Sequence, residues 1–397
     1  MGRAKLDTMT GFSPLVSPAA DLSQVEIERY SRQIILPGVG LEGQKRLKNA
    51  RVLIVGAGGL GAPTIMYLAA AGVGTLGIID DDTVDSSNLQ RQVIHREEAV
   101  GTLKVESAES FVAGLNPHVK TVTHAVRLDA SNILEIFRGY DVVLDGTDNF
   151  ATRYLVNDAA AIVGIPLIWG SILRFDGQVS VFWNGVGPTY RDLYPEAPPA
   201  GLVPSCAEAG VFGVLCAQIG GVMASEAIKL ITGIGKPLIG RVLILDALET
   251  SWTEVTLEKD PETVQPTELL DDYPAFCGLP TKGEEYVTVP EIDVRELKEL
   301  LKTREANNEH FELIDVREVG EAGIARIPGA TLIPRADILS GDVTLPQDKR
   351  IILHCKSGGR SAEVGRYLLA NGYENIQHVR GGVNAWIDSG QPGGSKY

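Results

Sequence analysis

Two cysteines of this sequence stand where a thiol could react. Cys206 lies in the stretch PSCAEAG, and Cys355 begins the stretch CKSGGRSAEVG after an apolar run. The second stretch predicts a buried strand, a tight loop that starts at Cys355, and a helix that opens near Ser361. In such a loop, backbone N–H groups turn toward the sulfur and the helix N-terminus adds positive potential, so the loop favours a thiolate or a persulfide.

The composition of this predicted persulfide loop strengthens the interpretation. Its residues are Cys355, Lys356, Ser357, Gly358, Gly359 and Arg360. Lys356 and Arg360 would add formal positive charge beside an anionic sulfur. A cysteine that only fills the core at a strand end needs neither the glycine pair nor the cations, which argues against that simpler alternative.

Cys206 is open to two interpretations. Its loop, which contains Gly and Pro, suits a thiol that forms a covalent intermediate, and an unreactive loop cysteine is the alternative. Glu208 stands close by in the sequence and would oppose ionisation of this thiol. Cys216 lies in the apolar run VFGVLCAQIGG and is expected in the core, and Cys277 is expected to be inert.

A glycine-rich turn far upstream of both cysteines predicts a nucleotide site. The segment RVLIVGAGGLGAPTIMYLAAAGVGTLGIID predicts a strand, a turn, a helix and a second strand that ends at Asp80. Glycines let the backbone approach a phosphate at the helix N-terminus, and an acidic residue at the end of the next strand suits a ribose hydroxyl pair. This pattern alone fits NAD as well as ATP.

Overall composition narrows the range of functions. The chain has 397 residues, of which 44% are hydrophobic and 22% charged, and a formal net charge of −15. This charge argues against nucleic acid as a direct partner, because phosphate binding needs a basic surface. The sequence shows no apolar run of membrane-spanning length and no signal-peptide pattern, so we expect no membrane partner and a cytoplasmic location. The few scattered cysteines do not suit a disulfide framework.

The order of the predicted elements indicates an α/β fold class with more than one domain. We predict a flexible N-terminal tail over residues 1–20, a nucleotide-binding domain over 21–258, a linker over 259–284 and a smaller α/β domain over 285–397. The linker is rich in proline and acidic residues and lacks hydrophobic periodicity. Such a linker would let the Cys355 loop reach the nucleotide site.

Several strings point to one family when they are taken together. Besides the glycine turn, the chain contains SNLQRQVIH, GTLKVESA, LDGTDNFATRY and PSCAEAG. With them, the first domain resembles the ubiquitin-activating-like adenylyltransferases of the MoeB/ThiF family, and the second resembles a rhodanese domain. The fusion is similar to the MoeZ type of adenylyltransferase/sulfurtransferase. This resemblance implies a Rossmann-like ThiF/MoeB adenylation domain followed by a smaller rhodanese domain.

The resemblance also implies roles in adenylation, and the chemistry of the residues agrees with them. The residues implied at the nucleotide are Gly59, Asp80, Ser87, Asn88, Leu89, Gln90, Arg91, Lys104, Asp148 and Asn149. Arg91 and Lys104 would neutralise phosphate charge, and Asp148 at a strand end would hold Mg²⁺. Hydride transfer needs no such set, which favours ATP over NAD. In the family Arg32 is supplied across a homodimer interface; taken alone, Arg32 could equally be a solvated helix residue.

Zinc is a point where the chain departs from the family. Many relatives carry two Cys-x-x-Cys pairs that hold a structural zinc ion. The corresponding positions here are 189–192, which contain no cysteine, and 274–277, which keep only Cys277. A single thiolate does not make a tetrahedral site, so we predict no zinc site and expect packing to hold this part of the fold.

The resemblance implies an enzyme that catalyses two linked reactions. The first is ATP-dependent adenylation of the C-terminal Gly-Gly carboxylate of a small ubiquitin-like sulfur-carrier protein, and the second is sulfur transfer from a Cys355 persulfide to give a thiocarboxylate. The sulfur donor would be a cysteine desulfurase or thiosulfate. A sulfurtransferase whose first domain only docks the carrier is the alternative, and the phosphate and metal ligands argue against it. The carrier, and with it the molybdopterin, thiamin, cysteine or tRNA thiolation pathway, stays open.

Overall fold

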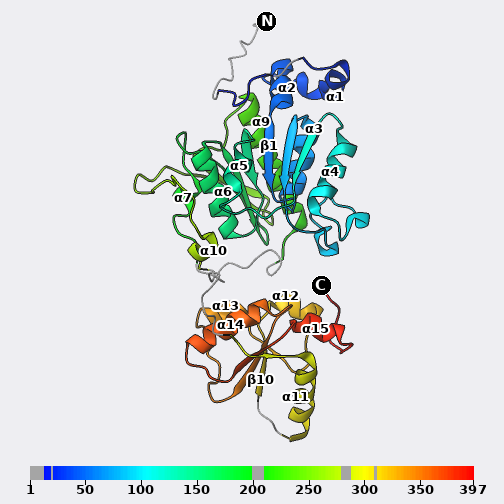
Figure 1. The fold of residues 1–397 in the computed structure, drawn as a ribbon, viewed down its shortest axis with the longest axis vertical. Helices are drawn as coiled ribbons and strands as arrows, with labels where there is room; N and C mark the ends of the chain where they lie inside the picture. The colour runs from blue at the N-terminus through cyan, green and yellow to red at the C-terminus, as the bar shows by residue number, and fades with distance from the viewer. Residues whose placement is uncertain (1–12, 19–20, 199–209, 279–287, 308–310) are drawn as a thin grey trace. The chain divides into compact units, whose positions relative to one another are not determined.

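The computed structural model describes residues 13–18, 21–198, 210–278, 288–307 and 311–397. These residues form two compact units (Figure 1). The first unit contains the described residues up to 197 and from 210 to 278, and the second contains residue 198 and those from 288 onward. Each unit has a largely parallel sheet with helices packed on it, so the predicted α/β fold class is confirmed.

The first unit is built around an eight-stranded sheet in the order β3-β2-β1-β4-β5-β6-β7-β8. Its strands are β1 Arg51–Val55, β2 Thr75–Ile79, β3 Lys120–His124, β4 Val142–Asp145, β5 Leu167–Leu173, β6 Asp176–Phe182, β7 Arg241–Asp246 and β8 Ser251–Thr256. The pairs from β3 to β5 are parallel, and those from β5 to β8 are antiparallel. Because β2, β1 and β4 are parallel neighbours, their carboxyl ends meet at one edge of the sheet.

Alternate residues of β1 show why this sheet carries helices on both faces. Val52 and Ile54 belong to one buried cluster, and Leu53 and Val55 belong to another. Helices α3, α4 and α9 contribute to the first cluster, and α5, α6, α7 and α10 contribute to the second. The helices are α1 Gln24–Ile34, α2 Gly40–Asn49, α3 Gly61–Ala71, α4 Lys104–Leu115, α5 Ile133–Phe137, α6 Phe150–Val163, α7 Tyr190–Leu193, α9 Gly213–Thr232 and α10 Tyr273–Phe276, with 3-10 turns at Ser86–Asn88 and Glu97–Ala99.

Helix α9 runs through the core of the first unit. Among the described residues it is the one helix whose length and composition would suffice to cross a membrane. Here it packs closely on the sheet, because a Cβ atom added at Gly170 or Gly177 would collide with side chains of α9. The apolar composition of α9 is therefore explained by packing against β5 and β6.

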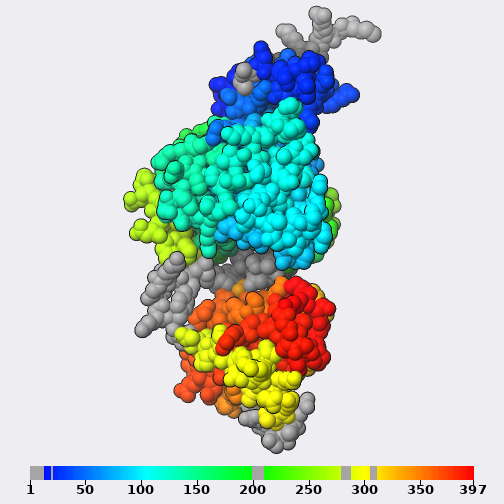
Figure 2. Space-filling view, turned by 45° about the vertical axis from the view of Figure 1, so that its right-hand side comes forward, coloured from blue at the N-terminus to red at the C-terminus, as the bar shows by residue number. Residues whose placement is uncertain are grey.

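The second unit contains a five-stranded parallel sheet in the order β11-β10-β12-β13-β9. Its strands are β9 Glu291–Ile292, β10 Phe311–Asp315, β11 Thr331–Leu332, β12 Arg350–His354 and β13 Ile376–Val379. Its helices are α11 Val294–Asn307, α12 Val319–Ile324, α13 Arg335–Leu339, α14 Gly359–Ala370 and α15 Gly382–Asp388. Figure 2 shows the segment that follows α15, in red, on the surface of this unit.

Candidate functional site

The glycine turn after β1 is tight because two glycines meet in it. Gly56 has a φ of 91°, a left-handed conformation that favours glycine. A Cβ atom at Gly61 would collide with the carbonyl oxygen of Gly56, so the chain can close this turn only with glycine there. Helix α3 begins at Gly61 directly after the turn, which confirms the predicted order of strand, turn and helix.

Neighbouring loops bring several predicted nucleotide residues to this turn. A Cβ atom added at Gly59 would lie 3.7 Å from the side chain of Arg91 and 2.8 Å from Cys216 Sγ. Cys216 is buried, as expected of a core residue. Arg91 Nη1 donates to the carbonyl oxygen of Ser87 at 3.0 Å, so the arginine closes the turn that carries the predicted set Ser87, Asn88, Leu89 and Gln90.

Asp80 and Lys104 lie close together at the end of β2, but the Lys104 ammonium is not free as the sequence predicted. Asp80 Oδ2 accepts from the backbone N–H of Ala57 at 2.8 Å, which ties β2 to the glycine turn. Lys104 opens α4 as predicted, but its ammonium is not free: it donates to Asp82 Oδ2 at 2.8 Å and lies 3.9 Å from Asp80. Burial raises the pKa of the Asp80 carboxyl, and the charge of Lys104 opposes that rise. A bound phosphate would therefore compete with Asp82 for the ammonium.

The loop after β4 lies against the glycine turn. A Cβ atom added at Gly56 would lie 3.5 Å from the carbonyl oxygen of Gly146 and 3.9 Å from Thr147. Asp148 follows Thr147 and is exposed. Asn149 caps α6, since its side chain accepts from the backbone N–H of Thr152 at 2.9 Å. Asn149 thus positions the helix that follows Asp148.

Two buried residues that flank this loop, one at the end of β4 and one in α6, were not predicted from the sequence. Asp145 is fully buried, accepts from Thr147 N and Oγ1 at 2.9 and 2.7 Å, and has its carboxyl pKa raised by burial. Arg153 donates to the carbonyl oxygen of Thr147 at 3.0 Å, and its guanidinium lies 5.4 Å from the Phe150 ring. The position of Arg153 in the first turns of α6 after Asp148 is the signal that could have marked it as a further cation near the site.

The remaining predicted residues of the first unit are not joined to these loops by any contact that the structure describes. Arg32 stands in the last turn of α1 and is exposed, next to the exposed apolar residues Ile35 and Leu36. Cys206 and Glu208 lie outside the described residues. The roles of Arg32 and Cys206 therefore stay predictions.

The segments 189–192 and 274–277, which were predicted to hold no zinc, lie together in the first unit. Arg191 donates to Asp158 through Nε at 2.8 Å and Nη2 at 2.7 Å, and the Tyr273 hydroxyl donates to Asp158 Oδ2 at 2.8 Å. The Arg191 guanidinium also lies 5.0 Å from the Phe276 ring. Cys277 is buried there, and burial raises the pKa of its thiol to about 11, which agrees with an inert thiol. Helix α10, within the predicted linker, is docked by these contacts.

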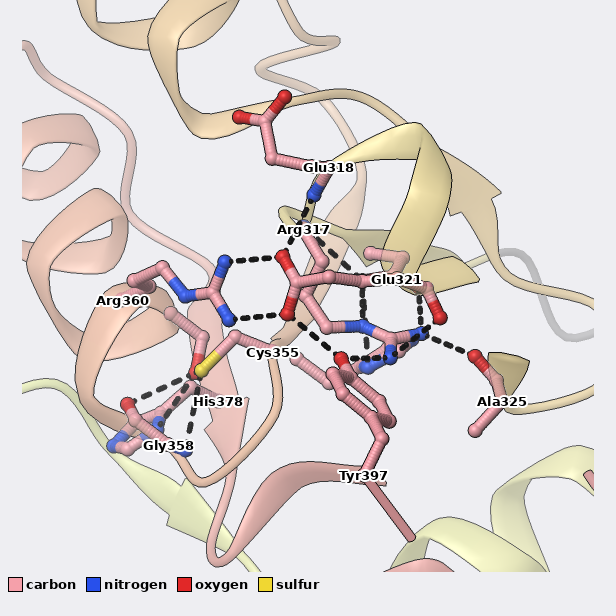
Figure 3. A network of polar contacts seen from close by, with 12 residues as sticks. Arg317, Glu318, Glu321, Ala325, Cys355, Gly358, Arg360, His378 and Tyr397 are labelled. Atoms are coloured by element: carbon pink, nitrogen blue, oxygen red, sulfur yellow. Dashed lines mark hydrogen bonds and ion pairs between the residues drawn. The ribbon is translucent and has the colours of Figure 1, made fainter. Parts of the chain in front are cut away.

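In the second unit Cys355 lies at the end of β12, and its thiol is buried (Figure 3). The backbone N–H of Gly358 donates to Cys355 Sγ at 3.1 Å, and Gly358 has a φ of 109°, a conformation that favours glycine. Helix α14 begins at Gly359, close to the predicted start at Ser361. A strand, a tight loop and a helix N-terminus thus surround the sulfur as predicted.

The two cations of the persulfide loop have partners of their own, which corrects the expectation that they face the sulfur. Arg360 donates to both carboxylate oxygens of Glu321, at 2.6 and 2.8 Å. Lys356 Nζ lies 4.6 Å from the centroid of the Tyr397 ring. Figure 3 shows the Arg360 guanidinium directed toward Glu321 and the Cys355 sulfur directed toward Gly358. Uncharged groups therefore make the closest described contacts of the sulfur.

Comparison with known proteins finds a family match for each of the two units. The ThiF family model matches residues 30–266, and the rhodanese-like domain model matches residues 293–389. The probable adenylyltransferase/sulfurtransferase MoeZ of Mycobacterium tuberculosis is 52% identical over 390 residues, which cover 96% of this chain and 98% of that protein. The adenylyltransferase and sulfurtransferase MOCS3 of Drosophila ananassae is 40% identical over 396 residues, which cover 94% of this chain and 85% of that protein.

Proteins that match only the first unit agree with its assignment to the ThiF family. The sulfur carrier protein adenylyltransferase of Thermus thermophilus is 53% identical over 264 residues, which cover 64% of this chain and 97% of that protein. Among solved structures, E. coli MccB with ATP has a TM-score of 0.52 at 22% identity, covering 60% of this chain and 74% of that chain. At this identity the structural likeness shows the fold alone.

Proposed function

The chain belongs to the ThiF family and carries a rhodanese-like domain, and we propose that it adenylates the C-terminal Gly-Gly carboxylate of a small sulfur-carrier protein and converts it to a thiocarboxylate. One observation carries the proposal: a single chain holds both a glycine turn packed against the loop after β4 and a cysteine under the N-terminus of α14. The first site suits a nucleotide and the second suits a persulfide.

In the first reaction a carboxylate oxygen of the carrier attacks the α-phosphorus of ATP, and pyrophosphate leaves. The glycine turn would hold the phosphates, and Asp80 at the end of β2 would take the ribose hydroxyls. Arg91 beside Gly59 and Lys104 beside Asp82 are the cations that would offset the developing charge. We expect Lys104 to leave Asp82 for the phosphate, because Asp82 is exposed and can be solvated instead.

The residues present fit a magnesium ion. Asp148 offers an exposed carboxylate next to the loop that contacts the glycine turn, and Mg²⁺ binds through few protein carboxylates together with phosphate oxygens and water. When bound, the ion would supply positive charge to the phosphates. Asn149 would keep Asp148 in place by capping the helix that follows it.

In the second reaction a persulfide on Cys355 attacks the acyl carbon of the adenylate, and AMP leaves. The product is an acyl disulfide between the carrier and Cys355. A thiol such as Cys206 can attack the Cys355 sulfur of this acyl disulfide, which releases the thiocarboxylate of the carrier and leaves a disulfide between that thiol and Cys355. An external reductant then reduces that disulfide and restores the Cys355 thiol. The backbone N–H of Gly358 would stabilise the persulfide anion between these steps.

Two exposed apolar surfaces of the first unit support the proposal that it binds other protein molecules. Edge strand β8 and the turn before it expose Leu248, Trp252 and Val255, and we propose that the carrier docks there.

Ile35 and Leu36 are exposed beside Arg32, and we propose that this surface forms a homodimer contact through which Arg32 reaches the partner's nucleotide.

The test is reconstitution with small carrier proteins that end in Gly-Gly. Each carrier is incubated with the full chain, ATP, Mg²⁺ and thiosulfate, and pyrophosphate release and the intact mass of the carrier are measured. We expect pyrophosphate and a mass gain that corresponds to replacement of one oxygen by sulfur. Sulfur transfer to cyanide without pyrophosphate release from any carrier would leave only a sulfurtransferase and contradict the proposal.

A further inference from the structure

Two neutral groups contact the sulfur of Cys355, and an imidazole lies behind one of them. Besides the Gly358 N–H at 3.1 Å, the hydroxyl of Ser361 lies 3.6 Å from Sγ. His378 stands behind Ser361, with Nδ1 3.5 Å from Ser361 Oγ. Ser361 is fully buried and His378 is 5% exposed. The thiol, the hydroxyl and the imidazole therefore form a continuous chain inside the protein.

A carboxylate completes this chain on the far side of the imidazole. β9 pairs with β13 in parallel, and the register sets Glu291 beside His378. His378 Nε2 lies 3.4 Å from Glu291 Oε1. A proton on Nε2 would face this carboxylate, which leaves Nδ1 unprotonated and able to accept a proton from Ser361. Such an order of nucleophile, hydroxyl, imidazole and carboxylate suits proton removal from the nucleophile.

The charge state of His378 suits a base. Burial lowers the pKa of its imidazole from the ordinary value of 6.5, which favours the neutral ring that a base needs. The charged groups that face it are Glu291 on β9, which raises this pKa, and Arg366 on α14, which lowers it. Arg380 at the end of β13 donates to Glu291 Oε2 at 2.8 Å and so weakens the effect of that carboxylate.

The hydroxyl of Ser361 can pass a proton because it is both donor and acceptor. It has one proton, which it donates to the carbonyl oxygen of Gly358 at 3.0 Å. By rotating, the same hydroxyl can donate to His378 Nδ1 while its oxygen accepts the thiol proton. Ser361 Oγ lies 3.6 Å from Cys355 Sγ and 3.5 Å from His378 Nδ1. Such long distances are common in a site without substrate, and catalytic hydrogen bonds shorten when a substrate binds.

We propose that His378 is the general base that removes the thiol proton of Cys355, through Ser361, when Cys355 takes sulfur from its donor. In this step the thiol proton goes to Ser361 Oγ, and the serine proton goes to His378 Nδ1. The thiolate attacks the outer sulfur of a donor persulfide, the S–S bond of the donor breaks, and the donor leaves as a thiolate that receives the proton from His378. The donor sulfur becomes the outer sulfur of the Cys355 persulfide, with no net oxidation. This inference rests on the proposed role of Cys355 in sulfur transfer.

The experiment measures thiolate formation directly in the full chain. The rate at which iodoacetamide alkylates Cys355 is followed by mass spectrometry from pH 6 to pH 10 in wild type, His378→Gln and Ser361→Ala. We expect both variants to react about a hundredfold more slowly near pH 7, the low end of what a general base contributes. The deficit should shrink above about pH 9, where thiols ionise without a base.

Several controls separate catalysis from structure. Ser340→Ala removes an exposed hydroxyl of the same unit and should leave the profile unchanged. Glu291→Gln keeps the imidazole but removes its carboxylate partner, so it should give a smaller deficit with the same dependence on pH. If His378→Gln does not fold, this variant and Ser361→Ala carry the test. A deficit of equal size at every pH, or none at pH 7, would overturn the inference. Alkylation needs neither ATP nor carrier, so failure of adenylation would be seen separately as missing pyrophosphate release.

Discussion

Tyr397→Phe removes one hydroxyl that joins two buried charged groups. The Arg317 guanidinium is fully buried, and its five N–H groups all have acceptors. It donates twice to the carboxylate of Asp315, at 2.8 and 2.6 Å, and once to the carbonyl oxygen of Ala325 at 2.6 Å. The last two N–H groups donate to the carbonyl oxygen of Glu321 at 3.4 Å and to the Tyr397 hydroxyl at 2.7 Å. Phenylalanine would leave one of them without an acceptor among the described residues.

The size of the effect follows from these contacts. A hydrogen bond to a charged group contributes about 1.5 to 3 kcal/mol, and a buried charged donor left without a partner costs at least as much. The Tyr397 hydroxyl also donates to Glu321 Oε1 at 2.7 Å, but that carboxylate keeps both bonds from Arg360. Because Tyr397 is only half-buried, water can replace part of the loss. We therefore expect the second unit to lose about 2 to 3 kcal/mol of unfolding free energy.

Hydrogen exchange followed by mass spectrometry can measure this loss in peptides of α14 and β12. Tyr397→Ala also removes the ring that contacts Lys356, so it should cost about 0.5 to 1 kcal/mol more. The matched control is Tyr367→Phe on α14, because the Tyr367 hydroxyl has no hydrogen-bond partner within the described part of the chain. Equal protection of wild type and Tyr397→Phe would show that the hydroxyl does not bridge Arg317 and Glu321 in solution, and the reasoning would be refuted.

Three further predictions follow from the sites. Cys355→Ala should abolish thiocarboxylate formation and leave ATP-pyrophosphate exchange intact; a parallel fall of both would refute the division of labour between the units. Asp148→Ala and Lys104→Ala should each slow exchange by about 10² or more, since loss of a transition-state partner costs about 2.7 to 4 kcal/mol, and near-normal exchange would remove that residue from the site. Burial raises the pKa of the Glu321 carboxyl, but the hydrogen bonds from Arg360 and Tyr397 outweigh it and hold this pKa below its ordinary value of 4.5. The stabilisation from Glu321 should therefore be complete above that pH and be lost as pH falls through the lower folded value, and in acid titrations of unfolding Glu321→Gln should lose this dependence.

Local pattern was enough to predict the framework of both sites. The turn from Gly56 to Gly61 and the loop from Cys355 to Gly359 each depend on residues that are neighbours in sequence, and both have the predicted strand, turn and helix. The apolar run of β1 likewise predicts a strand, and in the structure its successive residues contact different helix layers. The order of strand, turn and helix at both sites can therefore be predicted without knowing which distant residues are in contact.

Contacts between distant residues explain where the sequence interpretation went wrong. Arg360 and Glu321 stand 39 residues apart, and Lys104 and Asp82 stand 22 apart. A lone sequence shows the positive charge of each cation but not the carboxylate that binds it. The same holds for Ser361 and His378, which are 17 residues apart and meet only because β13 lies beside β12. Cationic residues near a nucleophile therefore predict a basic composition but not a basic site.

The arrangement around Cys355 has a chemical advantage for sulfur transfer. A persulfide that must attack an acyl-adenylate has to stay nucleophilic, and strong stabilisation of a sulfur anion lowers its nucleophilicity. Arg360 is bound by Glu321 and Lys356 lies over the Tyr397 ring, and the closest contact described for the sulfur comes from the neutral N–H of Gly358. Hydrogen bonds from neutral donors are weaker than those from charged ones, so they hold the anion while leaving its lone pairs reactive. The loop cations then serve to fix the loop to α12 and to the segment after α15, and the thiol relies on a neutral base for its ionisation.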